Sequence, residues 1–133
     1  MTAPKGKRSA TLDTLLGEAS WLLSHAEALT DYGRTEEAGT ELTRAAQCEE
    51  QVACLLEVAG REQEAVVHRV SAASCFEQVG EYARAVTLLR AALSAEIPRD
   101  YRRQLEQHIA RCLIRANKEV PRFSSTQLAS PRR

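Results

Sequence analysis

Five apolar patterns with helical spacing restrict the fold of this chain more than any other feature. Within each pattern, apolar residues recur at steps of three and four, which is typical of amphipathic helices. The patterns cover approximately residues 11–32, 35–59, 62–79, 81–96 and 98–119. Gly33, Gly60 and Gly80 end the first three, Pro98 follows the fourth, and Pro121 follows the fifth. We therefore predict an all-α protein of about five antiparallel helices with no strand.

Composition and length agree with one small helical domain. The chain has 133 residues, of which 44% are hydrophobic and only 5% aromatic, and it has only four prolines and six glycines. This favours helices over a β-sandwich. No apolar run approaches the roughly 20 residues that a membrane-spanning helix needs, and no secretory leader is recognisable. We expect a cytoplasmic protein with a basic disordered tail at 1–10, a helical domain at 11–119 and a disordered basic tail at 120–133.

The zero net charge conceals an uneven distribution. Residues 1–10 sum to +3, residues 11–100 to −9, and residues 101–133 to +6. Neither basic end forms a long polybasic arm, so nucleic acid is an unlikely partner. On the fifth predicted helix, Arg111, Arg115 and Lys118 follow steps of four and three and share one face. We predict that this face docks an acidic surface, on a partner protein or on another copy of the chain.

The helix starts repeat a pattern of small residues. Gly33 and Gly80 are each followed by alanine after five residues, leucine after nine and alanine after twelve, and Gly60 shares both alanines. Small side chains let antiparallel helices approach closely just beyond a tight turn. We therefore expect Ala85 to lie at such a contact. Residues 52–59 are apolar on almost all sides, which predicts that they form the centre of the domain.

Residues 66–93 resemble a tetratricopeptide repeat (TPR), a helix-turn-helix unit that stacks into a solenoid. The resemblance is carried by Ala72, Ala73, Phe76, Gly80, Tyr82, Ala85, Leu89, Ala92 and Leu93, and residues 19–46 form a weaker copy. Gly33 and Gly80 are 47 residues apart, whereas the family repeats every 34 or so. An up-and-down helical bundle, whose loops also favour glycine, remains the alternative.

The resemblance implies a non-catalytic adaptor that holds a peptide or helix of a partner protein in a groove. The groove would be lined by the first helix of each pair, which implies Glu27 and Thr30 on the first helix and Ser74, Glu77 and Gln78 on the third. Trp21 lies beside the leucine stripe and either covers the core edge or anchors a partner. Two alternatives are a structural bundle that self-associates through its second and fifth helices and a small nucleic-acid-binding protein that uses its basic end.

Motifs for catalysis or metal binding are missing from the sequence. HExxH, GxGxxG, GxxxxGK and GxSxG do not occur, and the four cysteines form no CxxC pair. We expect no enzymatic activity, no cofactor and no metal, with the cysteines as reduced core thiols. His25, His68 and His108 lie at or beside apolar stripes, and we interpret them as partly buried, hydrogen-bonded side chains.

Overall fold

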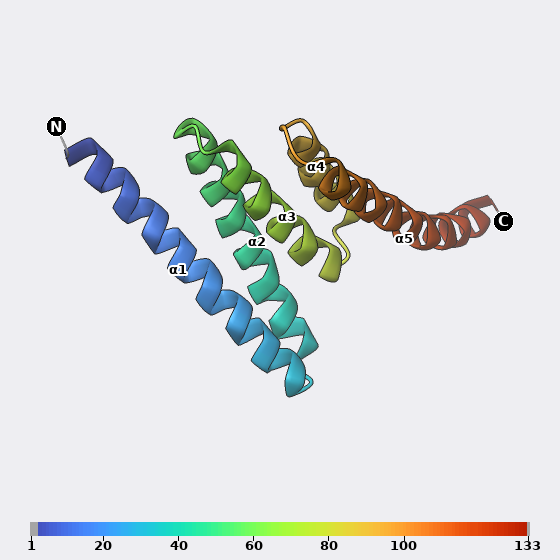
Figure 1. Ribbon diagram of the computed structural model, residues 1–133. Helices are drawn as coiled ribbons and strands as arrows, with labels where there is room; N and C mark the ends of the chain where they lie inside the picture. Colours follow the sequence, from blue (N-terminus) through green and yellow to red (C-terminus); the bar gives the residue numbers. More distant parts are fainter. Residues whose placement is uncertain (1–2, 133) are drawn as a thin grey trace.

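The described residues of the computed structural model form five α-helices and no strand (Figure 1). The backbone is described for residues 3–132 and the side chains for residues 11–118. The helices are α1 (Ala3–Asp31), α2 (Thr35–Val58), α3 (Glu62–Gln78), α4 (Tyr82–Leu93) and α5 (Arg99–Arg132). The predicted all-α class is confirmed.

Helices α2 and α3 match the sequence prediction to within one residue at both ends, because a glycine lies just beyond each of them. Helix α4 begins one residue later than predicted and ends at Leu93, three residues before the predicted end at 96. The outer ends differ, since the bounds of α1 and α5 reach Ala3 and Arg132, the latter beyond Pro121. The side chains at 1–10 and 119–133 lie outside the described residues. The two tails expected at 1–10 and 120–133 therefore stay predictions.

The helices follow one another in space in the same order as in the chain. Substantial packing joins only sequence neighbours, from α1 against α2 through to α4 against α5. In Figure 1, α1 lies at one side of the molecule, and α4 and α5 lie at the other. The arrangement is an open antiparallel array. Among the described residues, no helix combines the length and the apolar character needed to cross a bilayer.

Three of the four turns between helices share one hydrogen-bonded geometry. Gly33, Gly60 and Gly80 have φ angles of 78°, 79° and 83°, a left-handed conformation that glycine adopts without a Cβ penalty. Each glycine N–H donates to the carbonyl three residues earlier, and the following N–H donates to the carbonyl five residues earlier, at 2.8–3.1 Å. This is the Schellman motif, which satisfies carbonyl groups at a helix end. Each turn therefore reverses the chain in the same way.

The alanine five residues beyond each glycine is buried, as the repeated pattern predicts. The backbone N–H groups of Ala38, Ala65 and Ala85 donate to the carbonyl of the residue just after the glycine, at 3.0–3.1 Å. Their side chains are at most 1% exposed. The methyl group lies close to the turn, where the two helices of the hairpin pack against each other. A larger side chain has no room there.

The core divides into two clusters, and the larger does not lie where the sequence predicted. The larger cluster draws on all five helices and includes Leu22, Phe76 and Leu89. The smaller one joins the second half of α2 to α1 and the start of α3. The prediction that residues 52–59 form the centre was wrong, because Val58 is 75% exposed and Cys54 is also exposed. The array is open, so this end of α2 has neighbours on only part of its circumference.

Replacing Ala85 with leucine should destabilise the fold by about 1–3 kcal/mol, because the added side chain overpacks a contact that excludes solvent completely. Ala83 is the matched control, since it lies on the same helix and is exposed. Chemical denaturation of Ala85→Leu and Ala83→Leu would measure the difference in the free energy of unfolding. Equal stability of the two variants would contradict close packing at this turn.

Candidate functional site

A groove runs across one side of the array, from α1 past the start of α2 and the end of α3 to α5. Its two connected parts have volumes of about 780 Å³ and about 310 Å³. Thr30, Leu42 and Gln78 line both parts, so they form the middle of the groove. The charged residues are Glu27 and Asp31 in the α1 part, and Glu36, Glu77, Arg111 and Arg115 in the part that reaches α5.

Six of the nine residues predicted to bind a partner come together in this groove. They are Glu27, Thr30, Glu77, Gln78, Arg111 and Arg115. These residues belong to α1, α3 and α5, the helices that alternate along the array. Because the three glycine turns share one geometry, alternate helices from α1 to α4 present one edge to the same side of the molecule, and α5 reaches this side after the different turn at Pro98. The repeat geometry therefore collects residues that are distant in sequence.

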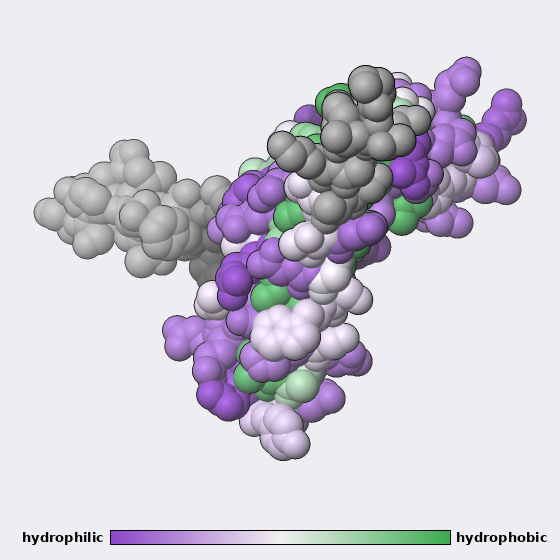
Figure 2. All heavy atoms as spheres, turned by 90° about the vertical axis from the view of Figure 1, so that its left-hand side faces the viewer, coloured by the Kyte–Doolittle hydropathy of each residue, from purple (hydrophilic) through white to green (hydrophobic). Residues whose placement is uncertain are grey.

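Three of the predicted residues do not line the groove. Ser74 is half-buried about one turn before Gln78, and Lys118 is exposed about one turn beyond Arg115. Trp21 is 59% exposed, and its ring stacks on His25 with 4.6 Å between the centroids. On the visible face formed by α1, apolar side chains occur in small separate groups among polar ones (Figure 2). Neither interpretation of Trp21 is decided by this placement.

Sequence reasoning missed the lining residues that α2 supplies. Ala38, Gly39 and Leu42 form an apolar wall opposite Val79 of the α3–α4 turn. Gly39 lies close to this valine, since a Cβ added to it would be 3.8 Å from the valine Cγ1. The repeated small residues were a usable signal for close packing. The small residues gave no indication that part of the α2 surface on which they lie remains uncovered and lines a groove.

Glu77 is the centre of the polar network at the α5 end of the groove. It was predicted as a groove residue, and it lines the groove while being buried, with 7% of its surface exposed. His108 Nε2 donates to its Oε1 at 2.7 Å, while Arg111 Nε and Arg115 Nη1 donate to its Oε2 at 3.0 and 2.9 Å. A second Arg111 nitrogen lies 3.3 Å from Oε1. A carboxylate from α3 therefore joins three side chains of α5.

The carboxylate of Glu77 is stabilised in its charged form. Burial by itself raises the pKa, but hydrogen bonds from Arg111 and His108, together with their charge, outweigh it and lower the pKa to about 2. The same bond to Glu77 raises the pKa of the Arg111 guanidinium. Both partners of the ion pair are thus stabilised in their charged forms. The pair links α5 to α3, although these two helices otherwise pack little against each other.

This network changes the interpretation of the basic face on α5. Arg111 and Arg115 were predicted to meet an acidic surface outside the chain, whereas both contact Glu77 of the same chain. Their side chains nevertheless remain 56% and 48% exposed. One negative charge is shared by two guanidinium groups, so the α5 edge of the groove has an excess of positive charge. Glu36 on the α2 edge brings a second negative charge to the same part of the groove.

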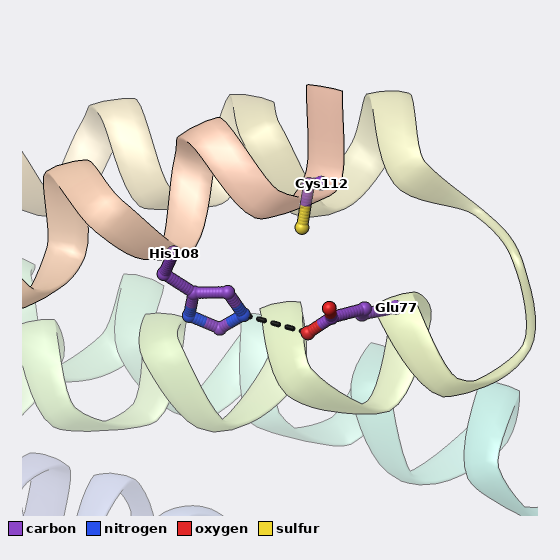
Figure 3. A group of neighbouring side chains, drawn as sticks. All are labelled: Glu77, His108 and Cys112. Atoms are coloured by element: carbon purple, nitrogen blue, oxygen red, sulfur yellow. Dashed lines mark hydrogen bonds and ion pairs between the residues drawn. The ribbon is translucent and has the colours of Figure 1, made fainter. Parts of the chain in front are cut away.

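Glu77, His108 and Cys112 form a group with potential metal-ligand atoms (Figure 3). Those atoms lie within 4.8 Å of one another, and the side chains of α5 point toward the glutamate of α3. The surroundings do not suit a cation, because both carboxylate oxygens already accept N–H groups and two guanidinium groups lie beside them. Burial also raises the pKa of the Cys112 thiol, which disfavours the thiolate that binds metals. The group is a structural ionic network.

Each of the three histidines bonds a glutamate from another helix, which confirms their interpretation as hydrogen-bonded side chains. His25 Nδ1 donates to Glu41 at 3.0 Å and joins α1 to α2. His68 Nδ1 donates to Glu49 at 2.6 Å and joins α3 to α2. Glu49 occupies an apolar-stripe position in the sequence and is buried, and it also accepts the Ser71 hydroxyl at 3.0 Å. With His108 and Glu77, these pairs supply polar links between the helices.

Comparisons with known proteins add no relative to this picture: no family model matches the chain, and no curated protein or solved structure matches it.

The cysteines are free, and three of the four are buried as predicted. Cys54 is the exception, since it is exposed on α2, where it lines a pocket together with Thr11 and Leu15 of α1. Burial raises the pKa of the Cys75 thiol to about 11 and raises that of Cys48 as well. A raised pKa reduces the thiolate fraction that reacts.

We expect Cys54 to react first with a thiol reagent under native conditions at pH 8, and the buried thiols to react only after unfolding. Titration with an aromatic disulfide reagent, with and without denaturant, would measure the two groups. The variant Cys54→Ser should lose the fast phase. A fast phase that persists in this variant would show that another thiol is accessible.

Glu77→Gln should lower the free energy of unfolding at pH 7 by about 1–3 kcal/mol, since it removes hydrogen bonds to a charged group. The pKa of Glu77 is lower in the folded chain than its ordinary value of 4.5. Its contribution is therefore fully present above pH 4.5 and decreases as the pH falls from there toward 2.

Urea denaturation of the parent and of Glu77→Gln at pH 7, 5 and 3.5 would test this. The difference in the free energy of unfolding should be largest at pH 7 and smallest at pH 3.5. Glu36→Gln, an exposed position, is the control and should show little change at any pH. A pH-independent difference would contradict the lowered pKa.

Proposed function

We propose that this protein is a cytoplasmic, non-catalytic adaptor of TPR-like type that binds a segment of another protein, a peptide or a helix, in the groove between α1 and α5. The observation that carries the proposal is the convergence of Glu27, Thr30, Gln78 and Arg111 from three separate helices on one groove. The TPR resemblance implied a groove lined by alternate helices. The free thiols are in keeping with a reducing compartment.

The chemistry of the groove supports binding rather than catalysis. Its most polar group, Glu77, is saturated by hydrogen bonds and is held in its charged form. A general base must be able to accept a proton near the working pH, and a carboxylate with a pKa of about 2 is a weak base. The remaining lining residues offer apolar contact, hydroxyl groups and an amide, which suit the recognition of a polypeptide.

Self-association remains a second candidate because of one observation on α5. Leu113 and Ile114 are adjacent and are 46% and 57% exposed. The sequence had suggested the second and fifth helices as a contact between copies. Light scattering of the purified chain would separate the two candidates, since an adaptor with a free groove does not need to dimerise.

The experiment that tests the adaptor function is selection of random peptides displayed on phage against the full chain. We expect enriched peptides whose binding is lost in Gln78→Trp, because Gln78 lines both parts of the groove and is exposed. Gln104→Trp is the matched control, since Gln104 is exposed on α5 and lines neither part of the groove. Peptides that bind the two variants equally would contradict binding in the groove.

A further inference from the structure

We propose that the groove recognises a polypeptide segment with opposite charges at its two ends and apolar side chains between them. An acidic side chain of the partner would lie against Arg111 and Arg115, and a basic side chain against Glu27 and Asp31. This inference rests on the proposed adaptor function and specifies the partner that the same groove selects.

The positive end of the groove lies on α5. Arg111 and Arg115 each carry five N–H donors, and their bonds to Glu77 occupy only part of them. About half of each side chain is exposed, and both line the larger part of the groove. Glu77 cannot bind a partner's cation, because its two oxygens are already used. The groups available to a partner at this end are therefore the two guanidinium groups, and the preferred ligand of a guanidinium group is a carboxylate.

The negative end lies on α1, on the other side of the array (Figure 1). Glu27 and Asp31 are four residues apart on one helix and line the smaller part of the groove. Both are exposed, and among the described side chains neither forms an ion pair. Like charges at this spacing repel each other. No basic side chain among the described residues pairs with either of them. A basic side chain of a partner placed between them would relieve the repulsion.

The middle of the groove separates the two charged ends with an apolar floor. Leu42 is half-buried and lines both parts, with Ala26 on the α1 side and Ala38 and Val79 on the α5 side. Glu36 lies on the α2 edge of the larger part and places a negative charge beside the floor, so the positive charge of this part is confined to the α5 edge. Since α1 and α5 lie at opposite sides of the array, a bound segment must cross this floor to reach both charged ends.

The order of charges along the partner, rather than its net charge, should therefore determine affinity. Exposed ion pairs each change affinity by up to about fivefold. Interchanging the acidic and basic residues of a selected peptide turns attraction into repulsion at both ends. We expect this exchange to weaken binding by about tenfold or more. The loss of affinity should be smaller at high salt, because salt screens the interactions between charges.

The test uses peptides selected on the full chain, each synthesised in its selected form and with its charges interchanged. Binding of both forms would be measured by fluorescence anisotropy at low and high salt. The double variant Glu27→Lys with Asp31→Lys changes only exposed side chains, so the fold is retained. It should weaken the selected peptides and favour those in which the basic end has been made acidic. Glu106→Lys, an exposed change on α5 outside the groove, should leave both affinities unaltered.

Arg115→Gln tests the positive end without removing the Glu77 ion pair, because Arg111 and His108 still contact Glu77. It should weaken only peptides that carry the acidic end. Two results would overturn this inference and leave the adaptor function standing. In the first, peptides whose binding depends on Gln78 bind equally well in their selected and charge-interchanged forms. In the second, the double variant Glu27→Lys with Asp31→Lys prefers the same form of the peptide as the parent does. If no peptide depends on Gln78, or if a second copy of the chain occupies the groove, both proposals fail.

Discussion

The hairpin turn ended by glycine is the constraint on which the rest of the structure depends. Gly33, Gly60 and Gly80 hold the same left-handed conformation, and the hydrogen bonds around them have the same pattern. An alanine follows each turn and is buried where the helices meet. Because these three turns are alike, each successive pair of helices from α1 to α4 is joined in the same way. The chain thus extends as an array in which alternate helices share a side.

The fourth turn differs from the other three, and a polar contact compensates for the difference. Pro98 precedes α5, and the backbone N–H of Arg102 donates to its carbonyl at 2.9 Å. Packing joins α5 chiefly to α4. The ion pairs from Glu77 add a link to α3, and the low pKa of this carboxylate shows that the charged form is stabilised despite its burial. Removing one partner of such a network leaves a buried charge uncompensated, which destabilises the fold.

The same ionic network relates the fold to the proposed binding surface. Arg111 and Arg115 are held in place by Glu77 and still expose about half of their side chains. Side chains that are already fixed lose less conformational entropy when a ligand binds. The contact of Glu77 with α5 therefore also orients the two arginine side chains at the positive end of the groove.

Periodicity and the glycine stops in the sequence determined the helices, since both are local properties of the backbone and of one helix face. The bounds of α2 and α3 were predicted to within one residue and the end of α4 to within three, and the burial of Ala85 followed from the repeat. Four groove residues were foreseen because the TPR resemblance supplied a rule about alternate helices, and Arg111 and Arg115 were foreseen from the basic stripe on the fifth helix. The tertiary structure alone decided that Glu77 is buried and that Cys54 is exposed, since the sequence contains no information on which neighbour covers a given face. It also decided that Arg111 and Arg115 pair with a carboxylate more than 30 residues away, because a contact between helices depends on how they are stacked.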